Sequence, residues 1–164
     1  MNLELIQSIT SNYPPDSFLP LYQNLLLQKK DVDMNILELP IPGDGSIKLW
    51  NQFFKNIPND WRDVDTSSDA FNSIQQFQQK NIKFDLVLIN NSSHIENICS
   101  CVELYAPLLA NKSVLAIENV LPTDVESICA KVPESIYNYI KNYQLNTTNT
   151  DTVIFTIDKS NLQL

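Results

Sequence analysis

Two short segments of almost continuous apolar residues constrain the fold of this chain most strongly. Residues 84–89 (FDLVLI) and residues 113–117 (SVLAI) lack the strict alternation of a strand with one wet face, and each is followed by polar residues. A strand that is apolar at successive positions is buried on both faces, which is typical of the central strands of a parallel sheet. The two segments therefore predict a sheet that is covered on its faces by helices.

Helical patterns alternate with strand patterns along the chain. We expect strands at residues 34–39, 84–89, 113–117 and 152–157, and a weakly patterned one at 61–64. Helices are expected at residues 3–9, 17–30, 46–54, 68–80, 95–109 and 123–131, whereas residues 135–143 fit either structure. Strands that alternate with helices form crossover units. The prediction is one α/β domain over residues 1–164, with N-terminal helices in residues 1–32. Its core, residues 33–164, is expected to be a three-layer, mostly parallel Rossmann-like sheet flanked by helices.

The charge and the cysteines of the chain exclude several classes of function. The formal net charge is −8 at pH 7, whereas binding to nucleic acid or to an anionic membrane needs basic surface. Residues 1–10 lack the basic flank and the cleavage site of a signal peptide, and three cysteines are an odd number for a disulfide framework. Cys99 and Cys101 are two positions apart on an expected helix and so point to different faces, which argues against zinc. We expect a cytoplasmic protein that binds neither nucleic acid nor a membrane.

Glycine is scarce, and both glycines lie in one loop. The chain has 2 glycines, where average usage would give about 11. They are Gly43 and Gly45, shortly after the expected strand at 34–39. Glycine is often retained where the backbone turns sharply or approaches a ligand closely. A plain surface turn is the alternative explanation.

Polar residues follow each expected strand. Open parallel sheets bind their ligands beyond the carboxyl ends of the strands. The polar residues at those ends are Glu38, Asp63, Asp65, Asn90, Asn91, His94, Glu118 and Asn119. We expect them to gather along one edge of the sheet, with a crevice there.

Three of these segments together resemble a known family. Residues 36–50 combine a Leu-Glu strand, the glycine loop and a helix that carries Trp50; residues 84–94 read FDLVLINNSSH, and residues 117–119 read IEN. In this order they resemble the Rossmann-like (class I) S-adenosylmethionine-dependent methyltransferases. More narrowly, they are similar to the macrolide-sugar O-methyltransferases and their cephalosporin-hydroxylase-like relatives, which read FDLIIDDGSH and IED at the last two segments. The resemblance covers about residues 34–120.

The resemblance implies O-methyl transfer from S-adenosylmethionine to a small-molecule or sugar hydroxyl. The cofactor would be bound by Glu38, Gly43, Asp44, Gly45, Ser46, Asp65 and Asn90. Asp63 and Asp69 compete with Asp65 for the ribose hydroxyls. His94, the only histidine, would be the general base, because histidine titrates near neutrality. Alternatively, His94 is only a polar residue at the start of the next helix, with no catalytic role.

Several positions depart from the pattern of that family. Pro40 stands where a glycine opens the loop, and proline offers no N–H group to a ligand. Asparagine replaces aspartate at Asn90, Asn91 and Asn119, and an amide brings no charge to a hard divalent cation. The positions that hold a metal in the family, Asn91, Glu118 and Asn119, are therefore degenerate, and no metal is expected.

The departures leave a second interpretation open. The segment between Asp65 and Phe84 is short, so the chain resembles a trimmed methyltransferase that lacks one strand. Such a chain is either an active, metal-independent enzyme or a non-catalytic pseudo-methyltransferase. In the second case it would act as a binding or assembly module, as a homo-oligomer or in association with an active relative.

Overall fold

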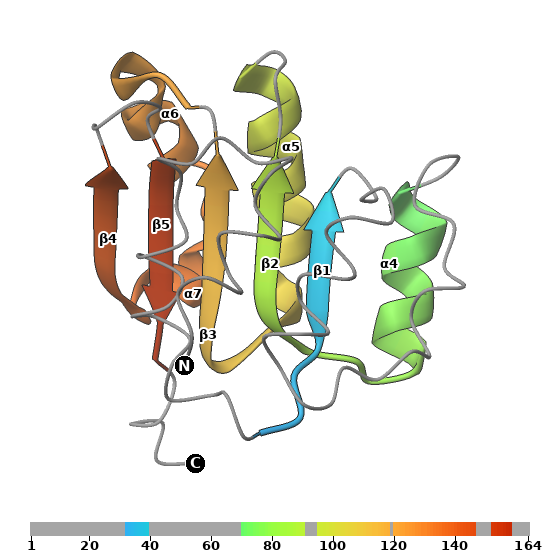
Figure 1. Ribbon diagram of the computed structural model, residues 1–164. Coiled ribbons are helices and arrows are strands. Elements are labelled where there is room, and N and C mark those ends of the chain that lie inside the picture. The colour runs from blue at the N-terminus through green and yellow to red at the C-terminus, as the bar shows by residue number, and fades with distance from the viewer. Residues whose placement is uncertain (1–31, 40–69, 91–94, 119, 147–151, 159–164) are drawn as a thin grey trace, which may run out of the picture.

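The computed structural model describes residues 32–39, 70–90, 95–118, 120–146 and 152–158 of the chain (Figure 1). The helices expected at residues 3–9, 17–30 and 46–54 and the strand expected at 61–64 lie outside these residues. Within the described ranges, no helix has both the length and the apolar character needed to span a bilayer.

Within the described residues, five strands form one mixed sheet with the order β1-β2-β3-β5-β4. Their bounds are β1 (Ile36–Leu39), β2 (Phe84–Asn90), β3 (Leu109–Glu118), β4 (Ile140–Asn146) and β5 (Thr152–Ile157). β1, β2 and β3 are parallel to one another, as Figure 1 shows by their arrowheads, and β5 is antiparallel to both β3 and β4. The parallel core predicted from the apolar segments is confirmed.

The antiparallel pair at the C-terminal end was not predicted from the sequence. β4 and β5 are joined by residues 147–151 alone, whereas a parallel connection needs a dozen residues or more. The two strands can therefore pair only in antiparallel fashion. The segment 135–143, which fitted helix or strand, contains both: the short helix α7 (Glu134–Tyr137) and the start of β4.

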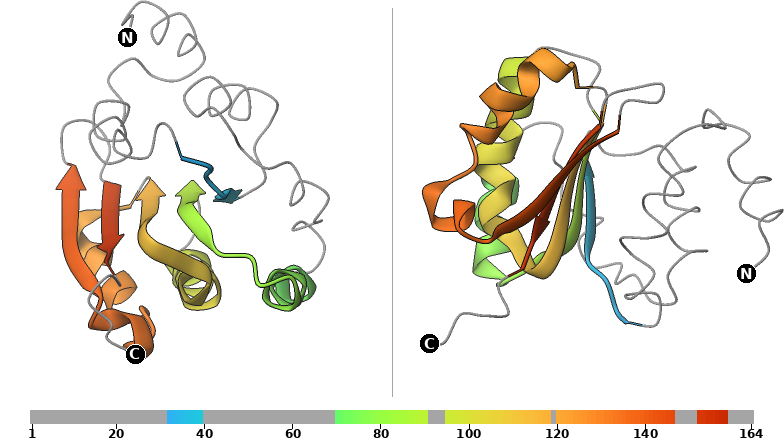
Figure 2. Two further views of the ribbon diagram at one scale, coloured as in Figure 1. Left: turned by 90° about the horizontal axis from the view of Figure 1, so that it is seen from below. Right: turned by 90° about the vertical axis from the view of Figure 1, so that its left-hand side faces the viewer.

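The described helices cover one face of the sheet (Figure 2). They are α4 (Ala70–Gln79), α5 (Ile95–Tyr105), α6 (Val125–Cys129) and α7, with 3₁₀ turns at η3 (Ala106–Leu108) and η4 (Pro122–Asp124). The helix expected at 95–109 ends at Tyr105, because Pro107 lies in η3 and has no N–H group to continue an α-helix. β3 therefore begins at Leu109, four residues earlier than expected.

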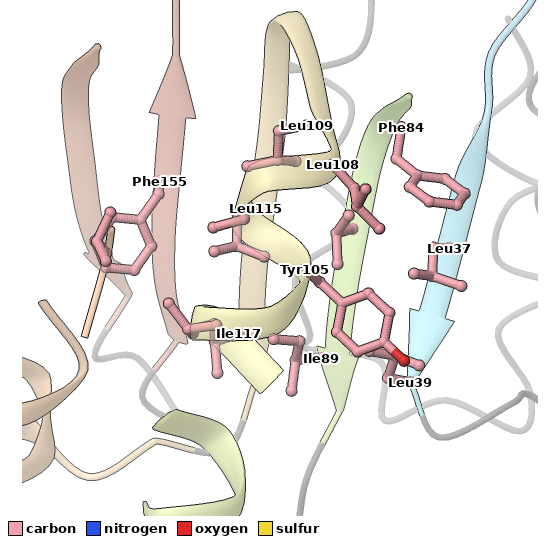
Figure 3. Packing of buried hydrophobic residues seen from close by; sticks show 14 of the residues in the cluster. Leu37, Leu39, Phe84, Ile89, Tyr105, Leu108, Leu109, Leu115, Ile117 and Phe155 are labelled. Carbon is pink, nitrogen blue, oxygen red and sulfur yellow. The ribbon is translucent and has the colours of Figure 1, made fainter. Parts of the chain in front are cut away.

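Alternate residues of the strands form the core under these helices (Figure 3). One row across the sheet, in register, consists of Leu37, Val87, Leu115 and Phe155, and the next row of Leu39, Ile89, Ile117 and Val153. All eight side chains belong to one buried cluster with apolar residues of α4 and α5. The intervening residues, which face the other side, are buried as well: Ile36, Leu86, Leu88, Val114, Ala116 and Ile154. Both faces of the central strands are thus withdrawn from water, as their continuous apolar pattern predicts.

Local hydrogen bonds fix the entry into β2 at the opposite, amino-terminal edge of the sheet. α4 ends in a left-handed residue, Asn81 (φ 52°), and the N–H of Ile82 donates to the Phe77 carbonyl at 2.8 Å. This is the hydrogen-bond pattern of a Schellman cap, in which asparagine tolerates the positive φ. The N–H of Asn35 donates to Oδ2 of Asp85 at 3.1 Å, which ties β1 to β2 at the same edge. These hydrogen bonds at the amino-terminal edge help to fix the register of β1 and β2, and the register determines where their carboxyl ends lie.

Candidate functional site

The carboxyl ends of β1, β2 and β3 lie together at one edge of the sheet (Figure 1). Leu39 pairs with Ile89, and Ile89 pairs with Ile117, so the three strands end almost level. Glu38 pairs with Leu88, and the backbone of Asn90 pairs with Glu118. Three of the polar positions predicted from the sequence are therefore brought to neighbouring strand ends.

Glu38 and Glu118 share the face of the sheet that lies opposite the helical core. Each alternates with residues of the buried cluster: Leu37 and Leu39 flank Glu38, and Ile117 precedes Glu118. The exposed fraction is 5% for Glu38 and 4% for Glu118. In the part of the chain that the structure describes, no other carboxylate side chain is buried. Buried acids are uncommon because ionised carboxylates lose hydration inside a protein, so two of them at one strand edge mark this edge as the candidate site.

Most of the other predicted site residues cannot be placed. Gly43, Asp44, Gly45, Ser46, Asp65, Asn91, His94 and Asn119 lie outside the described residues, as do Pro40, Asp63 and Asp69. For Asn90 only the backbone position is described. The roles assigned to these residues stay predictions.

The three cysteines are free thiols whose surroundings disfavour the reactive thiolate form. Sγ of Cys99 donates weakly to the Ser127 carbonyl at 3.8 Å, and burial raises the pKa of the thiols of Cys99, Cys101 and Cys129 above the ordinary value. A raised pKa leaves a thiol protonated and unreactive at neutral pH. Among the described residues, no three His, Cys, Asp or Glu side chains come close enough together to hold a metal ion.

A groove lies on the helical side of the sheet. It has a volume of about 330 Å³ and runs between α5 and α6, lined by Ile95, Glu96, Cys99, Ser100, Glu103, Ser127 and Lys131. Neither Glu38 nor Glu118 lines it. The groove could not be predicted from the sequence, because the packing of two helices against each other produces no recognisable pattern in the local sequence.

Comparison with known proteins identifies the fold. No protein-family model matches the sequence, and no curated protein is significantly similar to it. Among solved structures, the chain is similar to the MycE methyltransferase from the mycinamycin biosynthetic pathway, in complex with Mg and SAH (S-adenosylhomocysteine). The TM-score is 0.65 at 13% identity, over 94% of this chain and 54% of MycE. The chain thus spans about half the length of MycE.

Two further structures match most of both chains. A release-factor-specific protein-(glutamine-N5) methyltransferase from Alicyclobacillus acidocaldarius gives a TM-score of 0.60 at 9% identity, over 84% of this chain and 90% of that one. An O-methyltransferase from Bacillus cereus, in complex with SAH, gives a TM-score of 0.52 at 16% identity, over 96% of this chain and 90% of that one. The methyltransferase resemblance seen in the sequence is confirmed at the level of structure: this chain has the α/β fold of S-adenosylmethionine-dependent methyltransferases.

Proposed function

We propose that this chain binds S-adenosylmethionine at the carboxyl ends of β1, β2 and β3 and transfers the methyl group to a hydroxyl of a small molecule or sugar. The observation that carries the proposal is the pair of buried carboxylates, Glu38 and Glu118, on one face at neighbouring strand ends. Open α/β sheets bind ligands at this edge. Two solved structures of similar fold, MycE and the Bacillus cereus enzyme, are complexes with SAH.

The chemistry of the two carboxylates fits this cofactor. S-adenosylmethionine carries a cationic amine, a sulfonium and two ribose hydroxyls, and carboxylates accept strong hydrogen bonds from charged and hydroxyl donors. In the proposed site, Glu38 orients the amino-acid end of the cofactor through the loop that contains Gly43, Asp44, Gly45 and Ser46. Asp65 accepts hydrogen bonds from the ribose, and Asn90 completes the cofactor contacts.

His94 is the proposed general base. S-adenosylmethionine would supply a methyl group on a positively charged sulfur: the acceptor oxygen would bond to the methyl carbon as the methyl–sulfur bond breaks, and S-adenosylhomocysteine would leave. His94 takes the proton that the acceptor hydroxyl loses, and the chain otherwise contributes orientation and exclusion of water. His94 precedes Ile95, the first residue of α5, and follows the carboxyl end of β2 by four positions.

Replacing His94 with alanine is expected to lower turnover by about 10²–10⁴-fold, the usual contribution of a positioned general base. Binding of S-adenosylhomocysteine should change little, because the base acts on the acceptor. Release of S-adenosylhomocysteine, measured with an acceptor that the wild type methylates, checks the rate. Glu96→Gln, on the exposed first turn of α5, is the matched control. Unchanged turnover in His94→Ala would show that another group takes the proton.

Magnesium is not expected to stabilise the protein. Asn91, Glu118 and Asn119 together offer one carboxylate, and a hard dication prefers several charged oxygen ligands. We expect a thermal melt to give the same Tm with and without millimolar Mg²⁺. A clear rise in Tm with Mg²⁺, but not with an equal ionic strength of KCl, would contradict the metal-independent mechanism.

A non-catalytic binding module is the second candidate function. It is favoured by the amides at Asn90, Asn91 and Asn119 and by Pro40 at the cofactor loop, since loss of catalysis leaves such changes. This candidate predicts that no compound in a panel of phenols, sugars and other hydroxyl acceptors is methylated. Methyl transfer to any of them that depends on His94 would exclude it.

A further inference from the structure

Tyr105 places a hydroxyl group inside the core, on the face of the sheet opposite to Glu38 and Glu118. It is the last residue of α5 and is 2% exposed, one of the largest side chains that are fully buried. Its ring belongs to the cluster between the helices and the sheet. Figure 3 shows the ring directed toward Leu39, the last residue of β1, with the phenolic oxygen at that end. The hydroxyl therefore points to the carboxyl end of the strand that carries Glu38.

This hydroxyl has no hydrogen-bond partner among the residues that the structure describes. The other fully buried hydroxyl in those residues, Oγ of Ser113, donates to the Ala110 carbonyl at 2.6 Å. A buried polar group without a partner loses its hydration and gains nothing in return. Burial raises the pKa of the Tyr105 phenol, and the nearby Cys101 thiol adds to the rise. The group is thus a neutral O–H donor at any physiological pH.

Packing alone does not account for a tyrosine at this position. Phenylalanine would fill nearly the same volume among the apolar side chains of the cluster and would bury no unsatisfied donor. A buried unsatisfied group in a native protein points to a function or to a partner that arrives later. Tyr105 is directed toward Leu39 at the carboxyl end of β1 (Figure 3), the strand end at which the cofactor is proposed to bind.

We propose that Tyr105 is a positioning residue of the cofactor site, whose hydroxyl donates a hydrogen bond to a backbone carbonyl at the carboxyl end of β1 when the cofactor is bound. The inference rests on the proposed function. Among the described residues of the ligand-free protein this donor is unsatisfied, and occupation of the site brings a carbonyl at the end of β1 within its reach. A ligand shifts a protein toward the state in which it makes better contacts, so binding and the Tyr105 hydrogen bond favour each other.

The test is Tyr105→Phe, which removes one oxygen atom. We expect S-adenosylhomocysteine, titrated by calorimetry, to bind about three- to tenfold more weakly than to the wild type, the effect of one neutral hydrogen bond. The Tm of the ligand-free variant should be equal or higher, because an unsatisfied group is lost. Tyr139→Phe is the matched control, since Tyr139 is half-buried and packs against the same cluster near β4; it should bind the ligand as the wild type does.

A spectroscopic readout separates a hydrogen bond from a change in packing. The tyrosine bands of the ultraviolet resonance Raman spectrum report hydrogen bonding of the phenol. Adding S-adenosylhomocysteine should shift these bands in the wild type to the positions typical of a phenol that donates a hydrogen bond. The bands of Tyr105→Phe should not shift. Equal affinity of wild type and variant would overturn the role of Tyr105 while sparing the proposed function. Failure of the wild type to bind would overturn both.

Discussion

Replacing Phe84 with alanine is expected to lower the free energy of unfolding by about 3–5 kcal/mol. Phe84 begins β2 and is fully buried, and its ring meets that of Phe77 of α4 edge-to-face, with centroids 5.0 Å apart and an interplanar angle of 89°. The truncation removes a large apolar side chain and leaves a cavity between the helix and the sheet. Because small domains are stable by only about 5–15 kcal/mol, much of the stability would be lost.

Urea unfolding followed by circular dichroism measures this loss. Gln78→Ala is the matched control, because Gln78 is exposed on the same helix as Phe77; its effect should stay within about 0.5 kcal/mol. A loss below about 1 kcal/mol for Phe84→Ala, well under the range typical of buried phenylalanine, would mean that α4 does not pack on β2 in solution.

Replacing Glu38 with glutamine is expected to weaken binding of S-adenosylhomocysteine by about ten- to a hundredfold. Glutamine keeps the size of the side chain and removes its charge. A hydrogen bond to a charged group contributes about 1.5–3 kcal/mol, and each 1.4 kcal/mol is a factor of about ten in affinity. Glu38 is 5% exposed, so little water is present to replace the lost interaction.

The control for this variant is Glu103→Gln, since Glu103 is an exposed carboxylate of α5. It removes the same charge from the chain and should leave the affinity unchanged. A melt of Glu38→Gln is needed to establish that the variant is folded. If folded Glu38→Gln binds as tightly as Glu103→Gln does, Glu38 plays no part in the cofactor site.

The parallel core could be predicted from the sequence because its signal is local. The segments at 84–89 and 113–117 are almost continuously apolar, the segment at 34–39 is mostly apolar, and all three are bounded by polar or proline residues. The structure places β1, β2 and β3 there, with differences of a few residues at the ends. Glu38, Asn90 and Glu118 were predicted correctly as strand-end positions for the same reason.

The C-terminal part could not be predicted as well, because long-range pairing decides it. Residues 140–146 (IKNYQLN) contain polar side chains at several positions, so the segment has weak strand character by itself. It becomes β4 by pairing with β5, whose pattern is strong. The two strands are antiparallel because only residues 147–151 connect them. The alternation of helices and strands along the chain does not reveal this constraint.

Tyr105 shows why the contacts of individual atoms near the site could not be predicted from the sequence. The sequence predicts it as an apolar position of the helix at 95–109, at helical spacing from Ile98 and Val102, and all three side chains are buried as that spacing predicts. Whether its hydroxyl has a partner depends on residues far away in the chain. Side-chain periodicity identifies which face of a helix is buried, but it says nothing of the atoms that face one another in three dimensions.

Calorimetric titration of the wild-type protein with S-adenosylhomocysteine tests most directly whether the strand ends around Glu38 and Glu118 form a cofactor site. We expect saturable one-to-one binding well below 1 mM, which corresponds to a free energy more favourable than about −4 kcal/mol. A folded protein that shows no binding up to that concentration would contradict the account.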